Sequence, residues 1–227
     1  KKTKNGFTNE KLLQKANFAA ADMGGGKCVM YGGKDENGSL SDELVTSEIT
    51  INDYDNDNIN VNVQKINPSG TGPGALWKGR GTVFNIPDNS QNDRKFLRIY
   101  GGEDNNGDAK KEVYDYDFNE NKWTRSQLDM PIELKDMAVF KLLEDNEKVE
   151  ILLHGGVDKD NNSTAVLYKN LVFKGLHLKR HTSREKGKMN KIMEDDEDSE
   201  TWLRWDPDTG AWVYVSGRPL TAVPILP

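Results

Sequence analysis

The side chains that most often do chemistry are few in this sequence. The chain has three histidines, His154, His177 and His181, and no cysteine lies near them in the sequence. We therefore predict no metal site at these histidines. The single cysteine, Cys28, lies in a predicted strand without an evident base, so we interpret it as a small core residue rather than a nucleophile. The chain also lacks a Gly-x-Ser-x-Gly motif. We therefore predict no catalytic residue and expect that the protein is not an enzyme.

Two kinds of loop resemble ligand-binding loops but lack the residues that such loops require. The glycine-rich residues 69–78 do not end in the Gly-Lys-Ser/Thr of a phosphate-binding loop, and we interpret them as a flexible connection. The acidic residues 53–57 and 158–162 resemble the start of a calcium loop. Neither has Gly at the sixth position or Glu at the twelfth, so we interpret both as solvated turns. The sequence predicts no cofactor and no bound metal.

The strands that would position any functional residue are predicted by a pattern that repeats along the sequence. Three hydrophobic segments each run into a pair of glycines, namely Gly32 and Gly33, Gly101 and Gly102, and Gly155 and Gly156. A strand that ends at a tight turn needs backbone angles that a Cβ forbids, and glycine permits them. Each pair is followed by a stretch rich in Asn, Asp and Gly and then by another strand-like segment. This pattern predicts an all-β chain of repeated units.

A second shared pattern follows the middle glycine pair and recurs near the end of the chain. An aromatic residue, an Asp, a polar turn and a Trp occur at the same spacing in Tyr116, Asp117 and Trp123 and in Trp205, Asp206 and Trp212. The Asp and Asn side chains of such turns can accept hydrogen bonds from backbone N–H groups. We expect Trp123 and Trp212 to pack between neighbouring sheets. The third repeat has no tryptophan at this point, and we expect Phe173 or Leu176 in its place.

The order strand, Gly-Gly, polar loop, aromatic-Asp turn and Trp resembles the kelch repeat. The resemblance implies a kelch-type β-propeller, in which a repeat of about 50 residues forms one four-stranded antiparallel blade. It covers most of residues 16–217, with blades expected at about 16–66, 75–130, 133–179 and, in part, 201–217. The remaining segments are expected to be a basic tail at 1–15, a charged insertion or a gap at 180–200, and a Pro-bounded tail at 218–227.

Length and composition bear on the size of the predicted propeller, on its binding partners and on its location. At 227 residues the ring would be partial or very small, and the chain starts without Met, so we expect it to be part of a larger protein. The net charge of −6 argues against nucleic-acid binding over the whole surface. The sequence contains neither a membrane-length apolar run nor a signal-peptide pattern. We expect an intracellular location, in the cytoplasm or the nucleus, and no small-molecule substrate.

The resemblance also implies a function, because kelch-type proteins mostly act as adaptors, scaffolds or substrate receptors. We expect a protein–protein interaction scaffold, a subunit or effector of an intracellular complex, whose polar loops bind protein partners. The candidate partner-binding residues are Asp35, Glu36, Arg80, Arg98, Asp104 and Asp158, and the two arginines could anchor an acidic peptide. Two alternatives stay open. One is a substrate receptor of a ubiquitin ligase, and the other is a propeller enzyme with an unrecognised active site.

Overall fold

Three antiparallel sheets follow one another along the chain. The computed structural model describes residues 6–8, 10–53, 58–87, 93–146, 148–173 and 200–217. Apart from the short 3-10 helix η1 (Glu10–Leu13), every regular element among them is a strand, so the predicted all-β class is confirmed. No helix in the described ranges has the length and apolar character needed to span a membrane. Leu176, residues 180–199 and the tail 218–227 lie outside the described residues.

The sheets share one strand order. Sheet 1 contains β2 (Ala19–Gly24), β3 (Lys27–Tyr31), β4 (Leu44–Asp53) and β5 (Asn58–Ile66), with β1 (Gly6–Thr8) added in parallel beside β5. Sheet 2 contains β6 (Arg80–Pro87), β7 (Asp93–Tyr100), β8 (Val113–Asp117) and β9 (Lys122–Arg125). In both, each strand pairs with the next along the chain, as expected where hairpins follow one another.

Sheet 3 follows the same order over a longer stretch of sequence. It contains β11 (Ala138–Glu144), β12 (Lys148–His154), β14 (Leu167–Phe173), β15 (Glu200–Asp206) and β16 (Ala211–Gly217). The short strands β10 (Leu134–Lys135) and β13 (Val157–Asp158) pair with each other beside it. Because β15 is paired with β14, residues 200–217 complete the third sheet. The expectation of a separate partial repeat at 201–217 is therefore wrong.

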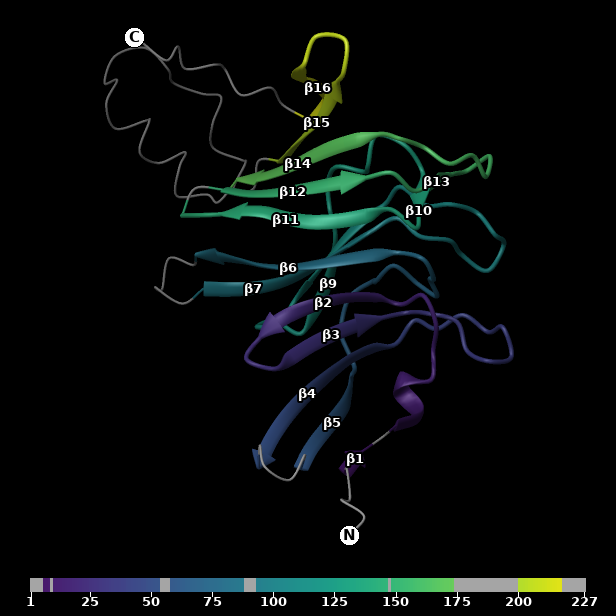
Figure 1. Ribbon diagram of the computed structural model, residues 1–227, viewed down its shortest axis with the longest axis vertical. Helices are drawn as coiled ribbons and strands as arrows, with labels where there is room; N and C mark the ends of the chain where they lie inside the picture. Colours follow the sequence, from purple (N-terminus) through teal and green to yellow (C-terminus); the bar gives the residue numbers. More distant parts are fainter. Residues whose placement is uncertain are drawn as a thin grey trace.

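The sheets stack face to face in the order of the chain, and Figure 1 shows them as successive layers. The first strands of the sheets lie side by side, with β2 against β6 and β6 against β11. One buried cluster fills the space between sheets 1 and 2 and includes Tyr31, Leu97 and Trp123. A second cluster between sheets 2 and 3 includes Tyr100 and Trp202. Burial of these apolar side chains is the main force that holds the layers together.

The glycine pairs occupy equivalent positions, directly after the second strand of each sheet. All six glycines have positive φ, as their place at strand ends predicts. At Gly101 a Cβ would lie 2.2 Å from the carbonyl oxygen of Leu134, and at Gly32 it would lie 2.2 Å from that of Leu76. The first two pairs thus let their strands end against the backbone of the connection that leads to the next sheet, whereas a Cβ at Gly156 would lie 2.9 Å from the carbonyl oxygen of Lys135.

The tryptophan between sheets 2 and 3 is Trp202 and not a residue predicted from the sequence. In sheet 2, Leu97 on β7 pairs with Tyr116, which pairs with Trp123. The equivalent row of sheet 3 runs from Ile151 through Asn170 to Trp202, which is fully buried. The expectation that Phe173 takes this place is wrong, since Phe173 packs with Leu171, Leu203 and Trp212 in a separate cluster.

Trp205 and Trp212 are a cross-strand pair in the β15–β16 hairpin, with ring centroids 5.5 Å apart. Asp206 accepts hydrogen bonds in the turn between them, as Asp117 does in the β8–β9 turn, so both predicted turns are confirmed. The expected position of Trp212 between two sheets is wrong. Its hairpin extends the edge of sheet 3, where the Lys169 ammonium lies 4.7 Å from the Trp212 ring centroid.

Candidate interaction surface

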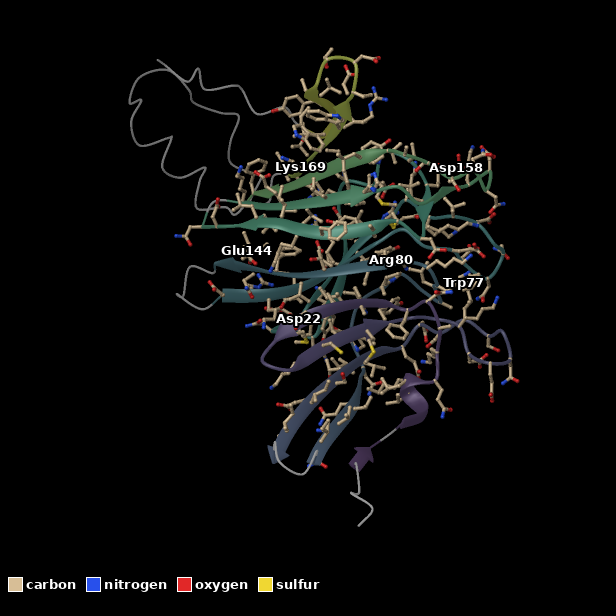
Figure 2. All side chains as sticks on the ribbon, viewed as in Figure 1. Asp22, Trp77, Arg80, Glu144, Asp158 and Lys169 are labelled. Atoms are coloured by element: carbon tan, nitrogen blue, oxygen red, sulfur yellow. The ribbon has the colours of Figure 1, made fainter. Side chains whose placement is uncertain are left out.

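The loops that follow the glycine pairs all lie at the same end of the sheets. We call this end the loop surface and define it as residues 34–42, 67–79, 103–112 and 157–164. The strands β3, β7 and β12 all lead into it, whereas the β2–β3 and β11–β12 hairpins lie at the other end. Figure 2 shows this arrangement, with Trp77 and Asp158 on one side of the molecule and Asp22 and Glu144 towards the other. Loops on a rigid sheet scaffold are a common location for binding residues.

Each loop after a glycine pair is built around one aspartate. The Oδ1 atom of Asp35 accepts hydrogen bonds from the N–H groups two and four residues further on, at 2.9 and 2.8 Å. Asp104 does the same at 2.8 and 3.1 Å, and Asp158 at 2.9 and 2.8 Å. These three predicted partner-binding residues therefore shape their loops. Among the candidates on these loops, Glu36 is the exposed side chain without such a role.

Trp77 is the centre of a charged cluster on the loop surface. The Lys34 and Lys78 ammonium groups lie 4.2 and 4.0 Å from its ring centroid, within the range of a cation–π interaction. Glu103 accepts a hydrogen bond from Lys135 at 2.6 Å and lies 3.8 Å from the Lys78 ammonium. Burial opposes ionisation of Glu103, but hydrogen bonds from Lys135 and Trp77 lower the pKa of its carboxyl. These contacts link the connection between sheets 1 and 2 to the loop that follows the glycine pair of sheet 2.

Arg80 and Arg98 have different surroundings. Arg80 is partly exposed at the edge of the Trp77 cluster, where its guanidinium contacts Asp136 at 2.9 Å. Arg98 is only 4 % exposed, because it lies between sheets 2 and 3. Its guanidinium hydrogen-bonds to Asp115, to Asn170 and to Glu200, so the expectation that it anchors a partner is wrong. Arg80 stays a candidate for partner binding.

Glu43 forms an ion-pair network at the base of the first loop. Hydrogen bonds from Lys15 and from Lys65 lower the pKa of the Glu43 carboxyl from 4.5 to about 2. A carboxyl whose pKa is depressed by folding stabilises the folded state above its unfolded pKa, and this contribution is lost as the pH falls through the folded pKa. The network is therefore fully effective above pH 4.5 and lost by about pH 2.

We expect Glu43→Gln to destabilise the protein near neutral pH and to have little effect near pH 2, where the wild-type carboxyl takes up its proton in the folded state. Urea unfolding of both proteins between about pH 2 and pH 6 measures the difference. It should shrink steadily below pH 4.5. A difference that does not change with pH would mean that the carboxyl charge is not what stabilises the loop.

A cavity of about 230 Å³ opens beside the Trp77 cluster, between sheet 2 and the connection from sheet 1. Its lining residues are Pro73, Leu76, Ile99, Gly101, Lys110, Glu112 and Tyr114. Leu76 and Ile99 are buried and apolar, whereas Lys110, Glu112 and Tyr114 add an ammonium, a carboxylate and a phenol. No local pattern predicts this cavity, because its residues come from separate segments that only the packing of the sheets brings together.

Cys28 and His154 lie in different sheets, and His177 and His181 lie outside the described residues. Among the described residues, no three His, Cys, Asp or Glu side chains have an arrangement that could hold a metal ion. The Cys28 sulfur lies 2.9 Å from the Ser47 hydroxyl on the neighbouring strand. His154 is exposed, whereas Tyr31 and Tyr100, at the equivalent positions before the glycine pairs of sheets 1 and 2, are buried. The difference arises because no further described sheet covers the outer face of sheet 3.

One of the solved structures that match supports this arrangement of sheets. Among the 89 chains that match is one from the cryo-EM structure of RAG in complex with one melted RSS and one unmelted RSS. It has a TM-score of 0.54 and 13% sequence identity, over 97% of this chain and 71% of that chain. The structure of YjhT matches with a TM-score of 0.48 and 14% identity, over 82% of this chain and 45% of that chain. Neither a family model nor a curated protein matches the sequence.

Proposed function

We propose that the three sheets are blades of a kelch-type β-propeller and that the protein is an interaction module that binds protein partners through its loop surface. The repeated strand order, the side-by-side first strands and the glycine pairs at equivalent positions support the propeller. At 13% identity, the likeness to the RAG chain supports only the fold part of the proposal.

The observation that carries the function is the convergence of three loops of the same design at one end of the sheets. In each of them, the aspartate at the start fixes the backbone with two hydrogen bonds. The loops therefore present the exposed side chains Glu36, Asp108 and Asp160 from a well-ordered backbone. Preordered loops lose less conformational entropy on binding than flexible ones, which favours recognition of another protein.

The test is a charge reversal that spares the structural aspartates. The variant Glu36→Lys, Asp108→Lys and Asp160→Lys changes one exposed side chain in each loop. We expect it to fold normally and to lose the proteins that the wild type retains in affinity purification followed by mass spectrometry. The loss should follow because partners that recognise the loop surface would meet three reversed charges.

The matched control is Glu48→Lys, Asp93→Lys and Glu120→Lys, which makes the same charge change on exposed side chains outside the three loops that follow the glycine pairs. It should retain the partners of the wild type. If the two triple variants behave alike, or if the loop variant retains its partners, the loop surface is not where partners bind.

A further inference from the structure

The cavity beside the Trp77 cluster is lined by both apolar and polar side chains. Leu76 and Ile99 are only 4% and 1% exposed, and with Pro73 they supply the apolar part of the lining. Lys110, Glu112 and Tyr114 supply the polar part of the lining, and Tyr114 is the cross-strand neighbour of Ile99. An elongated group with an apolar stem and a polar end would contact both.

The charged side chains that line the cavity decide whether the polar end of such a group should be cationic or anionic. The Lys110 ammonium is held by the Asp104 carboxylate at 2.6 Å, and this hydrogen bond raises the pKa of Lys110. The Glu112 carboxylate accepts only a long hydrogen bond, 3.3 Å, from the backbone N–H of Lys111. Within the described part of the chain, no Lys or Arg side chain forms an ion pair with Glu112. The charges of Lys110 and Arg125 act on Glu112 without forming an ion pair with it. The cavity therefore offers a carboxylate that has no ion-pair partner among the described residues, next to an ammonium that already pairs with Asp104.

The volume of the cavity indicates which kind of ligand it can hold. Sites for cofactors and other small molecules usually measure about 300–1,000 Å³, and this cavity is smaller, at about 230 Å³. It suits a single long side chain. The stem of a Lys or Arg side chain is apolar and its end is cationic. A cation beside Tyr114 and Glu112 would gain both a cation–π contact and a charge-assisted hydrogen bond.

We propose that this cavity receives a lysine or arginine side chain of the partner protein. The inference rests on the proposed function and names the chemistry by which the loop surface recognises its partner. The stem would lie against Pro73, Leu76 and Ile99, and the cationic end would reach Glu112. An anionic side chain would meet the unpaired carboxylate of Glu112 and be repelled.

The probes are four peptides, Gly-Gly-X-Gly-Gly, in which X is lysine, arginine, norleucine or glutamate. They are titrated into the isotope-labelled chain and followed by NMR chemical shifts at low ionic strength. We expect the lysine and arginine peptides to shift the amide signals of Gly101, Glu112 and Tyr114, and the norleucine and glutamate peptides to bind at least tenfold more weakly. Glu112→Gln should weaken the lysine peptide about tenfold, as loss of one charge-assisted hydrogen bond predicts.

The control variant Glu120→Gln removes an exposed carboxylate from the β8–β9 turn and should bind the lysine peptide like the wild type. Equal binding of the lysine and norleucine peptides, stronger binding of the glutamate peptide, or an unchanged affinity in Glu112→Gln would overturn the proposal. These outcomes are distinct from failure of the proposed function. If Glu112→Gln retains the partners that the loop variant loses, the loop surface binds proteins without using this cavity.

Discussion

Replacing Trp202 with alanine is expected to lower the free energy of unfolding by about 3–5 kcal/mol, the usual loss for a buried Trp. The Trp202 side chain is fully buried between sheets 2 and 3. Its ring meets those of Tyr100 and Tyr168 edge to face, with centroid distances of 6.0 and 6.4 Å. Truncation would leave a cavity between two sheets that are both fixed by hydrogen bonds, so the surroundings could not collapse into it. Urea unfolding followed by circular dichroism measures the loss.

Trp212→Ala is the matched comparison, because it removes the same number of atoms from the edge hairpin of the same sheet. Trp212 is only partly buried, and we expect a loss of about 1 kcal/mol. Trp202→Phe should also be milder than Trp202→Ala, because it keeps a ring and removes an indole N–H that has no hydrogen-bond partner among the described residues. Equal losses for Trp202→Ala and Trp212→Ala would contradict the placement of Trp202 between the sheets.

The repeat in the sequence predicts much of this fold, because its signals are local. A hydrophobic strand followed by two glycines predicts where a strand ends, and Gly101 and Gly102 have the positive φ values that this requires. The turn at Asp117 is equally local, since its carboxylate accepts hydrogen bonds from N–H groups two and three residues further on. Such features depend only on neighbours in the chain, which the sequence displays directly.

The placement of Trp202 and Trp212 could not be predicted in the same way. An aromatic-Asp turn followed by Trp forms a hairpin in both places where it occurs, but the pattern does not say what covers the hairpin. Trp123 faces sheet 1, whereas Trp212 lies at the edge of sheet 3. The strands β14 and β15 pair with each other although the segment 174–199 separates them in the sequence. No local sequence pattern therefore predicts this pairing.

In the candidate site, too, local features are predicted from the sequence, whereas features that depend on packing are not. The aspartates of the loops were identified from composition, but their role in shaping the backbone depends on hydrogen bonds that composition does not reveal. Arg98 is predicted only as a possible anchor for an acidic peptide, because a lone arginine on a strand gives no sign of whether it is buried. Its partners Asn170 and Glu200 belong to another sheet, and they meet Arg98 only when the sheets pack.

Arg98 forms the polar centre of the interface between sheets 2 and 3. Its guanidinium makes two parallel hydrogen bonds of 2.7 Å to Asp115 on β8. It also donates at 2.9 Å to Asn170 on β14 and to Glu200 on β15. Burial alone would lower the pKa of Arg98, but the charges of Asp115 and Glu200 more than compensate and raise it above its ordinary value. The network thus joins the two sheets and fixes β15, which carries Trp202, in its position.

Arg98→Met is therefore expected to destabilise the protein by about 3–5 kcal/mol, because it leaves Asp115 and Glu200 without their cation inside the interface. Adding Asp115→Asn and Glu200→Gln to Arg98→Met should recover a large part of this loss, since the triple variant buries no unpaired charge. Arg125→Met is the control, because the exposed Arg125–Asp129 ion pair should be worth less than about 1 kcal/mol. If Arg98→Met behaves like Arg125→Met in urea unfolding, or if the triple variant is less stable than Arg98→Met, unpaired buried charge is not the cause of the loss.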